Sequence, residues 1–161
     1  ICALQWGDIH EDSIMVSRNL SGTSSTVVSP KTARGTRRIA VHSRLLSVLD
    51  VWEDVQKERM AAAGFVPRPS TFVFTIDPAG TRPMPSNAVT VWWCRHRPDP
   101  SIRFHDLRHY NASVMLASGV DPVTASSRLG HSPDLMFKTY AHLMPQRDAA
   151  AAGIMDAAVL G

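Results

Sequence analysis

Hydrophobic and polar positions alternate over three short segments in the first part of the chain. These segments, residues 13–17, 26–29 and 38–41, are also rich in β-branched side chains. Alternation places apolar side chains on one face of extended backbone, so each segment is predicted to be a β-strand. A basic turn, residues 31–36, joins the second and third strands. We therefore expect a small three-stranded antiparallel sheet, preceded by a short helix whose last turn is Ala3–Leu4.

Apolar positions recur at helical spacing over most of the remaining chain. Leu45, Leu49 and Met60 lie on one stripe. This stripe predicts a helix over residues 43–63, with Ser43 as its N-cap. Further helices are expected over 85–96, 104–118, 121–129, 132–140 and 146–159, with an extended segment at 72–75 and a turn at 77–80. The expected fold class is α+β, mostly α-helical with a small three-stranded antiparallel sheet at one edge.

Composition is that of one ordinary globular domain. The chain has 161 residues, of which 44% are hydrophobic and 19% charged. It contains no uncharged apolar run of about 18 residues, so we expect no membrane span. The first residues lack the basic segment and cleavage site of a signal peptide. Cys2 and Cys94 form no metal or redox motif, and reduced thiols in a cytoplasmic protein are expected.

Positive charge is concentrated in two places. The formal net charge is +3 and the pI about 9.2. Residues 31–44 hold five basic and no acidic side chains, and a second cluster spans residues 95–108. Most of these residues are arginine, whose planar fork of donors suits phosphate oxygens. A polyanionic partner and an ordinary solvated surface both remain open on charge alone.

The helix predicted over 104–118 carries the first candidate site. His105, Arg108 and His109 fall within one sector of about 100° at its N-terminal end. That end of a helix carries partial positive charge and unbonded N–H groups, and so suits an anion. An exposed polar face is the alternative, and a metal site through the two histidines is weakly supported because no third ligand is evident. The opposite, apolar side is expected to be core: Leu107, Tyr110, Val114 and Ala117.

Three further candidate residues, His131, Tyr140 and Lys31, lie at the ends of predicted helices or in a predicted turn. Gly130 ends one predicted helix and places His131 between two helices. Tyr140 follows nine residues later, near the end of a short helix, and Lys31 stands in the basic turn between strands. Taken singly, these residues have ordinary interpretations as a helix-capping histidine, a packing tyrosine and a surface lysine.

Together these residues resemble the signature of the tyrosine recombinases, the phage integrase family. The matching order is Lys31, then His105-x-x-Arg108, then Leu129-Gly130-His131, then Tyr140. Residues 30–32 with 37–41 are similar to the family's β-turn lysine and following strand, and residues 4–9 to the segment after its first catalytic arginine. The resemblance covers essentially the whole chain. It implies that residues 1–161 are an integrase-like catalytic domain.

The resemblance implies site-specific DNA recombination, either integration or excision, for a phage or another mobile element. Tyr140 would attack a phosphodiester and form a 3′-phosphotyrosyl intermediate, with no ATP, metal or other cofactor. The remaining implied roles are His105 as base, Arg108 and His131 as phosphate ligands, and Lys31 as proton donor to the leaving oxygen. The DNA-binding residues would be Arg34, Arg37, Arg38, Arg103 and His109. The implied partners are double-stranded DNA and further copies of the full-length protein in a tetrameric synapse.

The chain departs from the family pattern at its beginning. The family places an arginine just before the position of Ile1, and a DNA-binding domain before that; neither is in this sequence. Loss of one preorganised donor costs about 10²–10³ in rate, so we expect the 161 residues alone to be an impaired fragment. The last helix, 146–159, would pack either on its own domain or on a neighbouring subunit.

Two alternatives differ in mechanism. The helices 104–118 and 121–129, with the turn between them, are compatible with a non-catalytic helix-turn-helix regulator that binds DNA reversibly. A type IB topoisomerase shares the tyrosine chemistry, but the Leu129-Gly130-His131 wording and the short spacing to Tyr140 favour a recombinase. The response to Tyr140→Phe separates the regulator from both enzymes.

Overall fold

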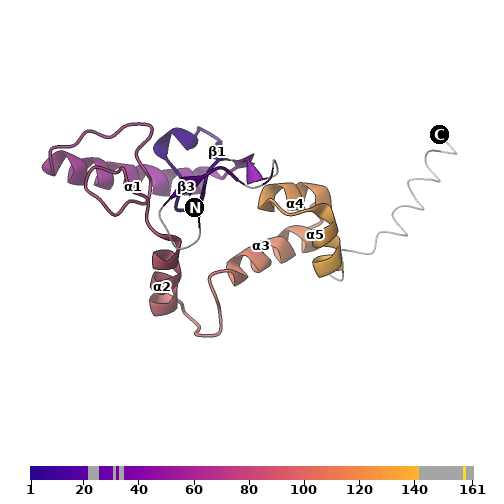
Figure 1. Ribbon diagram of the computed structural model, residues 1–161. Coiled ribbons are helices and arrows are strands. Elements are labelled where there is room, and N and C mark those ends of the chain that lie inside the picture. The colour runs from indigo at the N-terminus through magenta and orange to yellow at the C-terminus, as the bar shows by residue number, and fades with distance from the viewer. Residues whose placement is uncertain (22–25, 31, 33–34, 142–157, 159–161) are drawn as a thin grey trace. The chain divides into compact units, whose positions relative to one another are not determined.

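The computed structural model describes residues 1–21, 26–30, 32, 35–141 and 158. The chain forms two units, residues 1–106 and 107–161, which are described separately here (Figure 1). Lys31, Arg34 and almost all of the predicted helix 146–159 lie outside the described residues. In the part of the chain that is described, every helix is too short or too polar to cross a lipid bilayer.

The strands of the first unit pair as two separate antiparallel ladders. They are β1 (Ser13–Val16), β2 (Asn19–Leu20), β3 (Val27–Val28) and β4 (Arg37–Ala40). β1 pairs with β4, and β2 pairs with β3. The α+β class is confirmed, but the expected single three-stranded sheet is corrected to these two ladders. The break falls at Ser17–Arg18, where the Arg18 guanidinium donates to the Asp8 carboxylate at 2.5 Å.

The N-terminal segment pairs with a distant part of the chain. Leu4 accepts a backbone hydrogen bond from Val73 at 2.9 Å, and Trp6 donates to Thr71 at 3.1 Å. A short 3-10 helix, η1 (Trp6–Asp8), follows. The expected helix ending at Ala3–Leu4 was wrong, because the backbone groups there bond across to residues 71–73 rather than along a helix.

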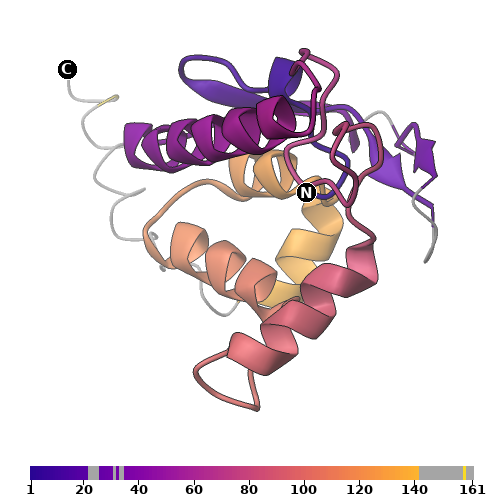
Figure 2. The ribbon, with the colours of Figure 1, turned by 90° about the vertical axis from the view of Figure 1, so that its left-hand side faces the viewer.

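Helix α1 (Ser43–Ala62) agrees with the predicted helix 43–63 and runs beside the strands in Figures 1 and 2. Its N-cap is His42 rather than the expected Ser43, because the His42 Nδ1 accepts the Arg44 N–H at 3.2 Å. Two polar contacts bind α1 to the 71–73 segment. The Trp52 indole donates to the Val73 carbonyl at 2.8 Å, and the Gln56 amide donates to the Phe72 carbonyl at 3.0 Å.

The turn predicted at 77–80 is present and is organised by one carboxylate. Gly80 donates to the Asp77 carbonyl at 3.1 Å and has φ +68°, a conformation that glycine adopts without strain. The Asp77 side chain accepts hydrogen bonds from Thr75, Thr81 and Arg82. Partial burial by itself raises the pKa of Asp77, but these hydrogen bonds outweigh it and lower the pKa to about 2.

Asp77→Asn should therefore lower the free energy of unfolding near neutral pH and remove part of its acid dependence. The folded-state pKa lies below the ordinary value of 3.8, so the Asp77 contribution is present above about pH 4 and is lost towards pH 2. Because solvent screens part of this interaction, we expect a loss of only about 1 kcal/mol at pH 7 and almost none at pH 2. Urea unfolding at several pH values measures this. Exposed Glu58→Gln is the control, and an equal loss at pH 2 and pH 7 would contradict the prediction.

Helix α2 (Ser86–His96) follows α1 in the first unit and matches the predicted helix 85–96. The described helices of the second unit are α3 (Asp106–Ala117), α4 (Pro122–Leu129) and α5 (Pro133–Tyr140). The predicted helices 104–118, 121–129 and 132–140 are each confirmed within two residues. The Asp121 and Ser132 side chains cap α4 and α5 by accepting from Thr124 and Leu135, and both helices have proline in the first turn.

Helices α3, α4 and α5 share one apolar core. Its buried members are Ala112, Leu116, Ala125, Leu129, Met136 and Tyr140. The buried side of α3 therefore carries Ala112 and Leu116. The opposite stripe, expected to be core, was assigned wrongly: Tyr110 is 70% exposed, and Leu107 and Val114 are exposed too. Both stripes have helical spacing, and the contacts with α4 and α5 decide between them.

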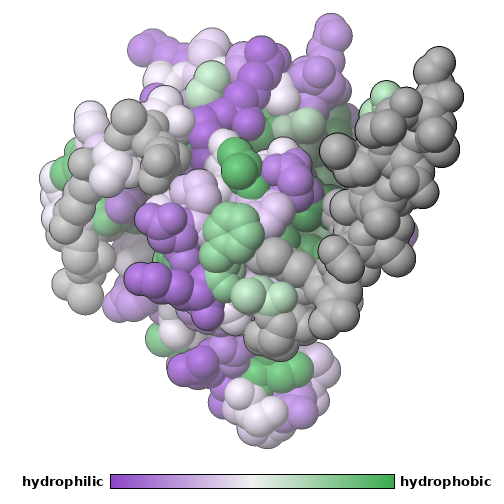
Figure 3. All heavy atoms as spheres, turned by 90° about the vertical axis from the view of Figure 1, so that its right-hand side faces the viewer, coloured by the Kyte–Doolittle hydropathy of each residue, from purple (hydrophilic) through white to green (hydrophobic). Residues whose placement is uncertain are grey.

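Leu116→Ala should destabilise this unit by about 2–5 kcal/mol, because a fully buried leucine leaves a cavity when truncated. Leu135→Ala on α5 is the matched control, since Leu135 is 47% exposed and its loss should cost little. Figure 3, which draws one face of the molecule, shows hydrophilic and hydrophobic residues intermixed on that face. Chemical unfolding of the two variants measures the difference, and equal losses would argue against this core.

Candidate active site

The loop between α4 and α5 places His131 by local geometry. Gly130 ends α4 in the left-handed conformation, with φ 71° and ψ 32°, which a residue with a side chain adopts only with strain. The His131 backbone N–H then donates to the Ser126 carbonyl at 2.9 Å. Ser132 caps α5 immediately afterwards. His131 is therefore held between two helix ends, as the sequence predicted.

Arg108, in the first turn of α3, is bound to this loop by two contacts. Its Nε–H donates to His131 Nε2 at 2.9 Å, and its Nη2 donates to the Leu129 carbonyl. Because Nε2 accepts, a neutral His131 carries its proton on Nδ1. Burial lowers the pKa of the half-buried Arg108, and the nearby Tyr140 phenol offsets part of that change. The guanidinium has five donors, so it can bind an anion as well as these partners.

Tyr140 ends α5 with its ring in the core and its hydroxyl at the polar side. The residue is 5% exposed and packs with Met136 in the core of the unit. Its hydroxyl lies 2.5 Å from His109 Nδ1. Burial raises the pKa of the Tyr140 phenol above its ordinary value, and the Arg108 cation partly opposes this. The phenol is therefore neutral at pH 7 and needs a proton acceptor to become a nucleophile.

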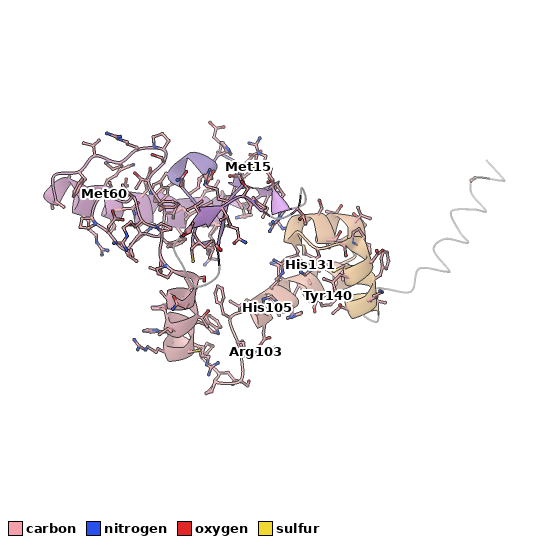
Figure 4. All side chains as sticks on the ribbon, viewed as in Figure 1. Met15, Met60, Arg103, His105, His131 and Tyr140 are labelled. Atoms are coloured by element: carbon pink, nitrogen blue, oxygen red, sulfur yellow. The ribbon has the colours of Figure 1, made fainter. Side chains whose placement is uncertain are left out.

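Four of the predicted site residues are thus brought together in the second unit: Arg108, His109, His131 and Tyr140. The last two are labelled in Figure 4. The arrangement offers a cation and a helix N-terminus for an anion, beside a phenol in contact with an imidazole. Among the described residues, no group of three or more His, Cys, Asp and Glu side chains could hold a metal ion.

The other predicted site residues belong to the first unit or lie outside the described residues. His105 is exposed in the turn just before α3. Arg103 is exposed and paired with Asp106, with 2.8 Å between Nη2 and Oδ1. Arg37 and Arg38 lie on β4, where Arg37 donates to the Gly35 carbonyl and Arg38 to the Ser13 hydroxyl. Lys31 and Arg34 are not among the described residues.

The contact between His109 and Tyr140 was not expected from the sequence. His109 was expected to bind DNA, and His105 to act at the tyrosine. A signal was nevertheless present, because His109, Ala112 and Leu116 have the spacing i, i+3, i+7 of one helix face. Ala112 and Leu116 on that stripe are buried in the same core as Tyr140. His109, at the N-terminal end of the stripe, therefore faces Tyr140.

Comparison with known proteins identifies the family to which this arrangement belongs. Residues 1–147 match the phage integrase family. The ICEBs1 integrase of Bacillus subtilis (strain 168) is 28% identical over 159 residues, which are 96% of this chain and 43% of that protein. The chain therefore spans less than half the length of that relative.

Solved structures with the same fold belong to the Tn1549 transposon integrase. Its complex with circular intermediate DNA has a TM-score of 0.68 and 22% identity, covering 96% of this chain and 53% of that one. A variant of it in complex with transposon right end DNA has a TM-score of 0.64 and 20% identity, covering 98% and 53%. At this identity the likeness shows the fold, which is the mostly helical α+β fold expected from the sequence.

Proposed function

Because the chain belongs to the phage integrase family, we propose that it is the catalytic domain of a site-specific tyrosine recombinase. Its substrate is double-stranded DNA, which it breaks and rejoins during integration or excision of a mobile element. The observation that carries this proposal is the cluster on the second unit, where Arg108 contacts His131 and the Tyr140 hydroxyl contacts an imidazole. The reaction proposed for this site, breakage and rejoining of DNA, comes from the family match.

The reaction conserves the phosphodiester bond energy. The Tyr140 oxygen attacks the phosphorus after losing its proton, and a bond forms between that oxygen and phosphorus. The bond from phosphorus to the 5′-oxygen breaks, and the 5′-oxygen leaves with its electron pair and takes up a proton. The products are a 3′-phosphotyrosine and a free 5′-hydroxyl. Attack by a 5′-hydroxyl on the phosphotyrosine reverses every step, so rejoining needs no external energy source.

Arg108 binds the non-bridging oxygens of the scissile phosphate and stabilises the charge that builds there in the transition state. Its contacts with His131 and the Leu129 carbonyl hold the guanidinium at one place, which reduces the reorganisation needed when DNA binds. His131 also donates to the phosphate once DNA is bound. The family pattern gives His105 the role of base for the Tyr140 proton, and Lys31 the role of proton donor to the leaving 5′-oxygen.

Binding of the duplex depends on arginines outside this cluster. Arg37, Arg38 and Arg103 lie in the first unit, and the sequence adds Arg34. Contacts of this kind to phosphates give affinity that falls steeply with salt. The Tn1549 integrase structures, in complex with DNA, are consistent with such a role for this fold. Like the family pattern, the proposal includes self-association of the full-length protein in a tetrameric synapse.

Covalent trapping tests the proposal. The protein, expressed from its complete reading frame, is incubated with nicked duplexes tiled across the DNA that flanks its gene. A nick lets the short cleaved strand diffuse away, so the covalent intermediate accumulates. We expect a protein–DNA adduct on a denaturing gel, and mass spectrometry should place the nucleotide on the peptide that contains Tyr140.

Other outcomes separate the alternatives. DNA binding with no adduct on any duplex would support the helix-turn-helix regulator and reject the recombinase. Adducts on duplexes of any sequence, together with relaxation of supercoiled plasmid, would support a type IB topoisomerase. Adducts confined to one or a few duplexes support the site-specific recombinase.

A further inference from the structure

The histidine in contact with the Tyr140 hydroxyl is His109. Its Nδ1 lies 2.5 Å from the hydroxyl oxygen, and the two ring centroids are 6.1 Å apart at 43°. The contact joins α3 and α5, which are 31 residues apart along the chain at these two positions. The backbone at His109 is helical, and its carbonyl accepts from the Ser113 hydroxyl at 3.0 Å. The imidazole is thus presented by a rigid element.

We propose that His109 is the general base of the cleavage step, receiving the Tyr140 proton on Nδ1 as the phenol oxygen attacks phosphorus. The proposal rests on the proposed function above. It differs from the family pattern, which gives this role to His105. The proton held on His109 returns to the Tyr140 oxygen when a 5′-hydroxyl displaces it, so cleavage and rejoining use the same residue in opposite directions.

Three features of the site support this assignment. A general base must lie within hydrogen-bond distance of the proton it removes, and His109 Nδ1 meets this condition. The Tyr140 ring is buried in the core of α3, α4 and α5, which fixes the position of its hydroxyl beside the imidazole. Arg108 precedes His109 on α3, so a single helical turn brings both the phosphate ligand and the proton acceptor to the phenol.

If the phenol donates this hydrogen bond, His109 Nδ1 must be the acceptor. A phenol is a good donor, and a neutral imidazole protonated on Nε2 offers its Nδ1 lone pair. An asparagine at this position can place a side-chain group near the position of Nδ1 and keep a hydrogen bond to Tyr140, but it cannot take the proton. This difference separates a base from a residue that only holds the tyrosine in place.

The test compares the single-turnover rate of adduct formation, at saturating nicked duplex, for the wild-type protein, His109→Ala and His109→Asn. Each protein is made with tyrosine and with a fluorinated, more acidic tyrosine at position 140. We expect both substitutions to slow the tyrosine proteins by about 10²-fold, within the range of general base catalysis. The fluorinated tyrosine should restore most of the lost rate, because it releases its proton more readily. DNA affinity should stay unchanged.

Asn111→Ala is the matched control, since Asn111 is exposed on α3 and lies about 200° around the helix from His109. Wild-type rates in His109→Ala would overturn the proposal. So would a full rate in His109→Asn, which would show that holding the hydroxyl suffices, or a failure of the fluorinated tyrosine to restore activity. If the wild-type protein itself forms no adduct, the proposed function fails; an adduct that does not depend on His109 overturns only this inference.

Discussion

Replacing Tyr140 by phenylalanine should abolish the covalent protein–DNA adduct while leaving the fold and DNA binding almost unchanged. The substitution removes only the hydroxyl, and the aromatic ring keeps its place in the core with Met136. Loss of the hydrogen bond to His109 should cost about 1 kcal/mol of unfolding free energy. Removing the attacking atom should lower the cleavage rate by at least about 10⁴-fold, as in enzymes that lose their nucleophile.

The chain offers a matched control for this substitution, because it contains two tyrosines. Tyr110 lies on α3 and is 70% exposed, so Tyr110→Phe removes an equivalent hydroxyl away from the proposed site. Adduct yield on the preferred nicked duplex and DNA affinity by fluorescence anisotropy are measured for both. Persistence of the adduct in Tyr140→Phe, or its loss in Tyr110→Phe, would show that another residue is the nucleophile.

Arg108→Lys should lower the cleavage rate at saturating DNA by about 10²–10³-fold, although the side chain keeps its positive charge. Lysine has no planar fork, so it cannot contact His131, the Leu129 carbonyl and a phosphate at the same time. We also expect a loss of about 1–2 kcal/mol in unfolding free energy, because a charged donor to buried acceptors is removed. Single-turnover cleavage and urea unfolding measure the two effects.

Arg59→Lys serves as the control for this exchange. Arg59 lies over the Trp52 ring in α1, with 5.5 Å from its guanidinium carbon to the ring centroid, and a lysine retains a cation there. Its cleavage rate should match the wild type. If Arg108→Lys cleaved at the wild-type rate, charge alone would suffice at this position, and the planar guanidinium of Arg108 would not be needed for cleavage.

Much of the fold followed from signals that lie close together in the sequence. The helices α1 to α5 were predicted with boundaries within about two residues, because their apolar stripes, caps and stops lie within a few residues of each element. Gly130 and Asp121 are examples: each acts on the helix end beside it. The order of Arg108, His131 and Tyr140 was equally visible, and with Lys31 and His105 it indicated the family that comparison then confirmed.

Pairings between distant segments were harder to predict from the sequence. Residues 13–17, 26–29 and 38–41 all have strand patterns that are compatible with one sheet. The observed strand pairing is nevertheless interrupted at Arg18, which bonds to Asp8, ten residues away in the sequence. The N-cap of α1 also differed, because His42 and Ser43 are both able to accept the N–H of an early helical residue. Local preference alone does not rank such alternatives, whose free energies differ by little.

The sequence by itself therefore determined helices α1 to α5, the α+β class and the residue types of the proposed site. Only the tertiary structure decided which face of α3 is buried and which histidine meets Tyr140. Both stripes of α3 have helical periodicity, and the choice between them depends on the shapes of α4 and α5, which pack against Ala112 and Leu116. Packing at that face brings His109 to within 2.5 Å of a hydroxyl that is 31 residues away. Periodicity reports which residues share a face of one helix, whereas contact between helices depends on how their side chains fit together.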